Sequence, residues 1–156
     1  LGRIGTTDKV ETDEDVTRLT DPHQALEFIL KTGIDALAVS VGTSHGLYVS
    51  TRPRIVYSII EEINRGSTIP LVLHGGSGVP AAMLEHAVRL PGGGISKVNI
   101  ATELEMAMLA SLGRNGHMTE ADLNALNQQD IQTARTAVLH LVVDKIEHYT
   151  FSARTV

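Results

Sequence analysis

Cysteine and tryptophan are absent from this chain of 156 residues, and aromatic residues make up only 3% of it. Without cysteine there is no disulfide, no cysteine-ligated zinc and no thiol nucleophile, which is the pattern expected of a cytoplasmic protein. Positive charge is also scarce, because 13 Lys and Arg against 18 Asp and Glu leave a net charge of −5. A mildly acidic chain with few aromatics is a poor nucleic-acid binder. No apolar run approaches the ~20 residues of a membrane helix, so we expect no membrane partner.

The chain alternates between segments with helical apolar spacing and short continuous apolar runs. A hydrophobic content of 42% with 20% charged residues excludes wholesale disorder. Asp21 and Pro22 predict a helix start, and Gly33 predicts its end. Helical spacing predicts further helices over residues 54–65, 80–90, 102–112 and 130–149. Short apolar runs predict strands buried on both faces over residues 36–42 and 69–73, and a third strand over residues 95–100. This order predicts an α/β fold with a parallel sheet.

Polar clusters follow each of the three predicted strands. They read GTSHG at residues 42–46, HGGSG at residues 74–78 and NIAT at residues 99–102. Ligands bind at the carboxyl edge of parallel sheets and barrels, so this edge is the predicted site.

Two histidines, His45 and His74, occupy matching positions after the first and second predicted strands. Neutral imidazole is a common ligand of divalent transition metals, which favours a shared metal ion. The alternative is a pair of hydrogen-bonded structural histidines. A catalytic zinc normally has about three protein ligands, so a third must come from elsewhere.

A phosphate site is predicted from the glycine-rich turn at residues 75–78 and from Thr102 at the next helix start. Backbone N–H groups in such turns bind anions, and Ser77 adds a hydroxyl. The alternative is a tight turn followed by an ordinary N-cap. Asn99 could equally contact a substrate or form a hydrogen bond within a loop. Lys97 is a less favoured candidate for a Schiff-base lysine. The residues Met106, Met108 and Leu109 are expected in the core.

These motifs together resemble the class II, metal-dependent ketose-bisphosphate aldolases. The matching stretches are LGRIG, TGIDALAVSVGTSHGLY, IPLVLHGGSGVP and ISKVNIATEL, and more loosely KIEHYTFSAR. The resemblance implies the C-terminal half of a (β/α)8 TIM barrel with a long C-terminal helix. Residues 1–156 would then be the C-terminal part of one barrel domain. A start at Leu1 rather than Met agrees with missing N-terminal strands.

The resemblance also implies the roles of individual residues. It makes His45 and His74 two of three zinc ligands. It assigns the binding of the ketose phosphate to Gly46, Gly75, Gly76, Ser77, Asn99, Ile100, Ala101 and Thr102. The family's catalytic aspartate and remaining zinc histidine lie upstream of Leu1, so no catalytic residue is expected in this chain. Arg154 loosely matches a C-terminal arginine that reaches a substrate phosphate.

The function implied is a lyase. A Zn²⁺-dependent enzyme of this family reversibly cleaves a ketose 1,6-bisphosphate, tagatose or fructose, to dihydroxyacetone phosphate and glyceraldehyde 3-phosphate, and is a homo-oligomer, either dimer or tetramer. Three alternatives stay open: a related phospho-sugar-acid aldolase, a catalytically incomplete phosphate-binding or assembly subunit, and a metal-free phosphate-binding barrel. The last predicts that His45 and His74 lie more than ~8 Å apart, too far to share a metal.

Overall fold

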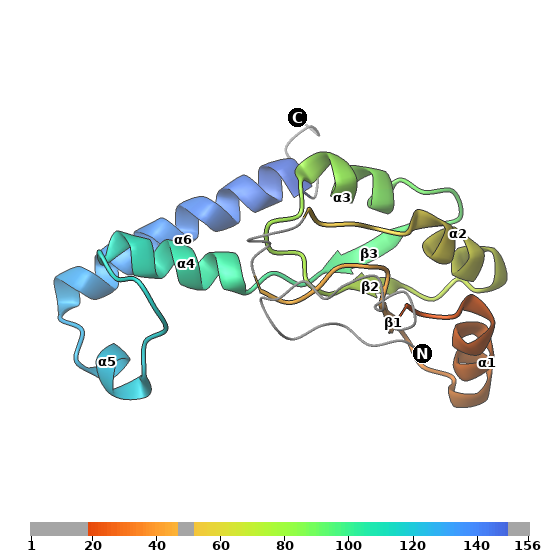
Figure 1. Ribbon diagram of the computed structural model, residues 1–156, viewed down its shortest axis with the longest axis horizontal. Coiled ribbons are helices and arrows are strands. Elements are labelled where there is room, and N and C mark those ends of the chain that lie inside the picture. The colour runs from red at the N-terminus through yellow and green to blue at the C-terminus, as the bar shows by residue number, and fades with distance from the viewer. Residues whose placement is uncertain (1–18, 47–51, 150–156) are drawn as a thin grey trace. The chain divides into compact units, whose positions relative to one another are not determined.

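The structure is a computed structural model that describes residues 19–46 and 52–149. The chain divides into two compact units, Leu1–Ile100 and Ala101–Val156. We call the described residues of the first the sheet unit and those of the second the helical unit. The elements of both are labelled in Figure 1.

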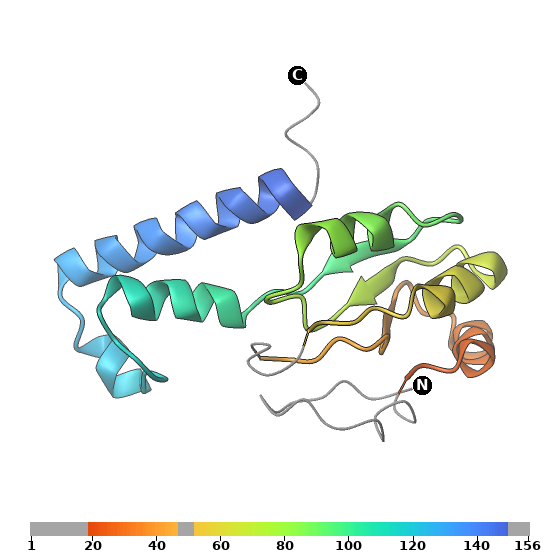
Figure 2. The ribbon, with the colours of Figure 1, turned by 45° about the horizontal axis from the view of Figure 1, so that its top comes forward.

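The sheet unit contains three parallel strands in the order β1-β2-β3. They are β1 (Leu37–Val39), β2 (Leu71–Leu73) and β3 (Ile95–Val98). Leu37 pairs with Leu71, and Leu71 pairs with Ile95. The helices are α1 (Pro22–Thr32), α2 (Tyr57–Gly66) and α3 (Ala81–Val88), and the last two connect successive strands (Figure 2). The predicted parallel α/β arrangement is therefore confirmed. The described strands form an open sheet, and a half barrel stays a prediction.

The first helix begins and ends where the sequence predicts. The Asp21 side chain accepts a hydrogen bond of 2.9 Å from the Gln24 N–H, and Pro22 occupies the first turn. Gly33 ends the helix at φ 63°, a left-handed conformation that glycine adopts without steric cost.

Helix α2 starts at Tyr57, three residues later than expected. The reason is a tertiary contact: the Val56 N–H donates to the Val41 carbonyl at 2.8 Å, which ties the segment before the helix to the chain leaving β1. Ile55, counted as a helical position, is buried in that segment instead.

The first two strands were expected to be buried on both faces, and this was wrong for the described part of the chain. In β1 the side chains of Leu37 and Val39 are buried while Ala38 is exposed. In β2 the same alternation leaves Val72 half-buried between two buried leucines. The core therefore lies on one face of the sheet, where Ile60 and Leu84 are also fully buried.

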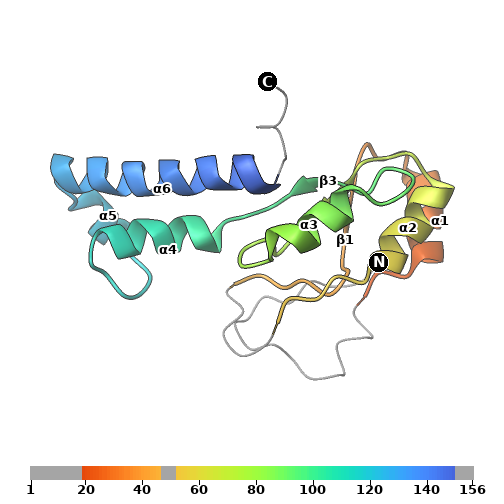
Figure 3. The same cartoon turned by 90° about the horizontal axis from the view of Figure 1, so that it is seen from above.

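The helical unit consists of α4 (Thr102–Ser111), α5 (Glu120–Asn124) and α6 (Gln128–Tyr149). Helices α4 and α6 pack side by side and run in opposite directions (Figure 3). Leu109 is buried as expected, but Met106 is 45% exposed, so its assignment to the core was wrong. Methionine fits both a core and a surface position, which the apolar pattern alone does not separate. No helix in the described ranges is long and apolar enough to cross a membrane.

Candidate active site

Three polar side chains mark the carboxyl ends of the three strands. His45 follows β1, His74 directly follows β2, and Asn99 directly follows β3. Because the strands are parallel, their carboxyl ends share one edge of the sheet. The Asn99 N–H also donates to the Leu73 carbonyl at 2.9 Å, which brings the second and third strand ends together.

The imidazole rings of His45 and His74 are tilted relative to each other, with their centroids 5.3 Å apart and their planes at 54°. Two imidazoles that share one tetrahedral zinc through bonds of about 2 Å have centroids roughly 5 Å apart. The observed spacing fits that arrangement and is shorter than the metal-free alternative predicts. The described residues contain no group of three or more His, Asp or Glu side chains that could hold an ion.

The environment of His74 favours its neutral form. Partial burial lowers the pKa of His74, and electrostatic interactions with His45 and Lys97 lower it further. A metal ligand must be the neutral imidazole, so this environment favours ligation.

Asn99 lies directly against the His74 ring. Its side-chain nitrogen, Nδ2, is 3.1 Å from Nε2 and 3.4 Å from Nδ1 of His74. The Lys97 ammonium donates to the Asn99 amide oxygen, Oδ1, and so turns the NH₂ group toward the imidazole. Lys97, considered above as a Schiff-base candidate, here orients an amide. Its spacing of two residues from Asn99 on an extended strand places both side chains on one face, which is the signal that could have shown this.

The glycines after His74 are required by the packing of the strand-end loops. Gly75 has φ 68°, and a Cβ there would lie 2.3 Å from the Ser44 carbonyl oxygen. A Cβ on Gly76 would lie 2.5 Å from Cγ1 of Val98. The Gly76 N–H donates to the Asn99 carbonyl at 3.0 Å. We therefore expect Gly76 to shape the loop rather than to bind an anion through its N–H.

A further tie between two loops was not expected from sequence. The Thr43 hydroxyl is buried and donates to the His74 carbonyl at 2.6 Å. It holds the loop that carries His45 beside the one that carries His74. Nothing in the local sequence GTSHG distinguishes this threonine from an ordinary loop residue, because its partner is 31 residues away.

The predicted phosphate-binding residues are divided between the two units. The sheet unit contains Gly46, the buried Ser77, Asn99 and Ile100, together with Gly75 and Gly76. The helical unit contains Ala101 as N-cap of α4 and Thr102 as its first residue, and no side chain caps this helix. Arg154, like the LGRIG stretch, lies outside the described residues.

Comparison with known proteins gives a consistent family. The model of the family described as fructose-bisphosphate aldolase class-II matches residues 1–153. The chain is similar to the YdjI aldolase from Escherichia coli K12, with 32% identity and a TM-score of 0.64 over 83% of this chain and 44% of that one. It is also similar to a structure named "putative fructose-1,6-biphosphate aldolase" from Coccidioides immitis, with 25% identity and a TM-score of 0.65 over 95% and 50% of the two chains. The chain thus spans about half the length of these structures.

Proposed function

Since this chain belongs to the class-II fructose-bisphosphate aldolase family, we propose that the protein is a zinc-dependent lyase acting on a ketose 1,6-bisphosphate. The reaction is the reversible cleavage of tagatose or fructose 1,6-bisphosphate to dihydroxyacetone phosphate and glyceraldehyde 3-phosphate. The observation that carries the proposal is the pair of imidazoles 5.3 Å apart at the carboxyl edge of the sheet. Residues 1–156 are then the C-terminal part of one barrel domain, and a dimer or tetramer belongs to the same proposal.

In this proposal His45 and His74 are zinc ligands. The bound ion supplies Lewis acidity that stabilises negative charge developing on the substrate. The sheet unit contributes two further features to that chemistry. The environment that lowers the pKa of His74 keeps its imidazole ready to ligate, and the Asn99 amide is held beside it by Lys97. We propose that Asn99 donates to a substrate oxygen near the ion.

The sugar phosphate is bound by the loop after β2 and by the N-terminus of α4. Ser77 donates its hydroxyl, and Gly46, Gly75 and Gly76 allow the loops to approach one another and the ligand closely. Asn99 through Thr102 complete the site, with Thr102 on the phosphate and Asn99 on the dihydroxyacetone part. The N-terminus of helix α4 carries the positive end of the helix dipole, and its N-cap, Ala101, has no polar side chain to cap it.

The test is cleavage of fructose and tagatose 1,6-bisphosphates by the protein as its gene encodes it, followed by coupled reduction of the triose phosphate. We expect turnover that a chelator removes and zinc restores. Ser77→Ala should raise KM about tenfold with little change in kcat, because a lost hydroxyl contact to the phosphate costs about 1.4 kcal/mol of uniform binding. The exposed Ser58 on α2 gives the control, Ser58→Ala, which should behave as the parent. Absence of cleavage of either sugar in zinc-loaded protein would overturn the proposal.

A further inference from the structure

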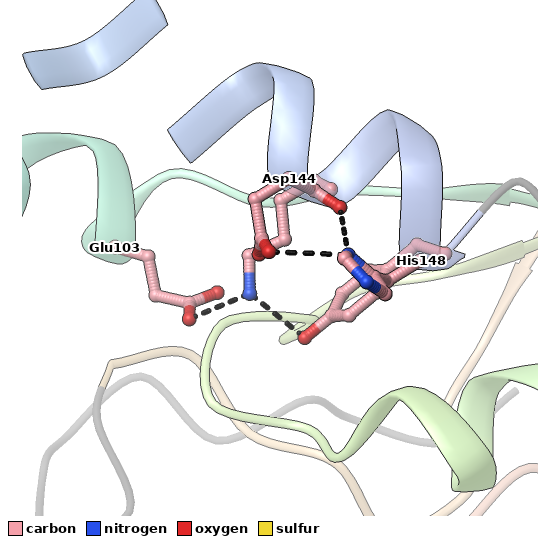
Figure 4. Close-up of polar contacts among 5 residues, drawn as sticks. Glu103, Asp144 and His148 are labelled. Atoms are coloured by element: carbon pink, nitrogen blue, oxygen red, sulfur yellow. Dashed lines mark hydrogen bonds and ion pairs between the residues drawn. The ribbon is translucent and has the colours of Figure 1, made fainter. Parts of the chain in front are cut away.

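A partly buried ion pair joins the first turn of α4 to the last turns of α6. The Lys145 ammonium donates to Oε1 of Glu103 at 2.8 Å and to the Tyr149 hydroxyl at 2.9 Å (Figure 4). The same ammonium lies 4.3 Å from the centroid of the Tyr149 ring. The Lys145 and Glu103 side chains are only 15% and 20% exposed. The neighbouring ion pair of Asp144 with His148 is solvated, with exposures of 55% and 60%.

The position of Glu103 makes this pair more than a helix contact. It directly follows Thr102, and α4 carries two acids in its first turn, Glu103 and Glu105. Carboxylates at a helix N-terminus interact favourably with the dipole, but they repel any phosphate that binds there. Each acid contacts a basic side chain: Glu105 contacts the His117 imidazole, and Glu103 contacts the Lys145 ammonium.

Stability alone gives little reason for this partly buried pair. Removing two charges from water costs about as much as their attraction returns, so such a pair is weak evidence of a stabilising role. Burial lowers the pKa of Lys145, but its hydrogen bonds to Glu103 and Tyr149 outweigh burial and raise the pKa overall. Lys145 therefore stays charged at neutral pH and can neutralise the carboxylate.

We propose that Lys145 is a positioning residue for phosphate binding, which holds the Glu103 carboxylate against α6 and neutralises it so that the N-terminus of α4 accepts a sugar phosphate. This inference rests on the function proposed above, because it takes the α4 N-terminus as part of the phosphate site. Tyr149 assists by fixing the ammonium through its hydroxyl and its ring.

The test measures binding of inorganic phosphate to the full-length protein by calorimetry, together with KM and kcat for the ketose bisphosphate. Lys145→Met should weaken phosphate binding roughly three- to tenfold, with KM raised and kcat retained. Adding Glu103→Gln to this variant should restore affinity to within about twofold of the parent. Lys145→Arg should keep the parental affinity, and Glu103→Gln alone should bind phosphate at least as tightly as the parent.

The matched control is Lys31→Met, which removes an exposed lysine paired with Glu27 on α1. It should leave phosphate binding unchanged. Parental affinity in Lys145→Met would overturn the inference, as would a double variant as weak as the single one or weaker binding in Glu103→Gln. If the parent cleaves no ketose bisphosphate while Lys145→Met still loses phosphate, the proposed function fails and the inference stands. If the parent cleaves the ketose bisphosphate but Lys145→Met binds phosphate as tightly as the parent, the inference fails and the proposed function stands.

Discussion

The sheet unit buries most of its large apolar side chains, with Leu30 on α1 exposed, whereas the helical unit leaves several of its own in solvent. Val39, Ile60, Ile63, Leu73 and Leu84 are all fully buried in the sheet unit. In the helical unit, the buried apolar side chains among the described residues are Leu109, Met118 and Ala134, and Leu139 is 58% exposed. The candidate metal ligands therefore stand on the densely packed unit. In the helical unit, a polar contact between Lys145 and Glu103 joins α6 to α4.

The largest expected effect is at Gly75, where the sheet unit allows no side chain. Gly75→Ala places a methyl group against the Ser44 carbonyl at positive φ, so the His45 and His74 loops must move apart. We expect a loss of about 4 kcal/mol in the free energy of unfolding of the sheet unit. The control is Gly113→Ala in the helical unit, at φ 64° with open space around it, which should cost only about 1 kcal/mol. Equal losses in denaturant titrations of the two variants would remove the contrast.

The second-largest expected effect is on core packing, which should differ between the two units. Leu73→Ala deletes a fully buried side chain on β2 and should cost about 3 kcal/mol, because a cavity is left in a dense core. Leu139→Ala on α6 removes a side chain of the same type that is mostly in solvent, so its cost should stay within about 0.5 kcal/mol. Urea unfolding of both variants checks this. A loss at Leu139 as large as that at Leu73 would mean that α6 is covered in the native protein.

The smallest expected effect is a pH dependence at α5. Thr119 and Asp122 form a capping box, in which the Thr119 hydroxyl and N–H donate to the Asp122 carboxylate. These bonds lower the pKa of Asp122 below its ordinary value of 3.8. Since the folded pKa is the lower one, the stabilisation is present above pH 3.8 and is lost as the pH falls through the folded pKa. Amide exchange of α5 should accelerate in that window in the parent, and much less in Thr119→Ala. An identical pH profile in both would show that the box does not hold the helix.

The features that could be predicted from the sequence depend on local contacts, and those that could not depend on contacts between distant residues. The ends of α1 were predictable because Asp21, Pro22 and Gly33 act through local contacts. The start of α2 was not, because the Val56 bond to Val41 crosses from one segment to another. The two histidines could be paired from their matching places after strands. The amide of Asn99 against His74 and the bond from Lys145 to Glu103 join residues 25 and 42 positions apart, and no local pattern contains them.

The central claim is that His45 and His74 bind zinc, and the zinc content of the full-length protein tests it most directly. After dialysis, we expect about one zinc per chain in the parent and at least tenfold weaker retention in His74→Ala. His23→Ala removes an exposed histidine from α1 and should retain the parental content. Zinc bound by His74→Ala as tightly as by the parent would contradict the account.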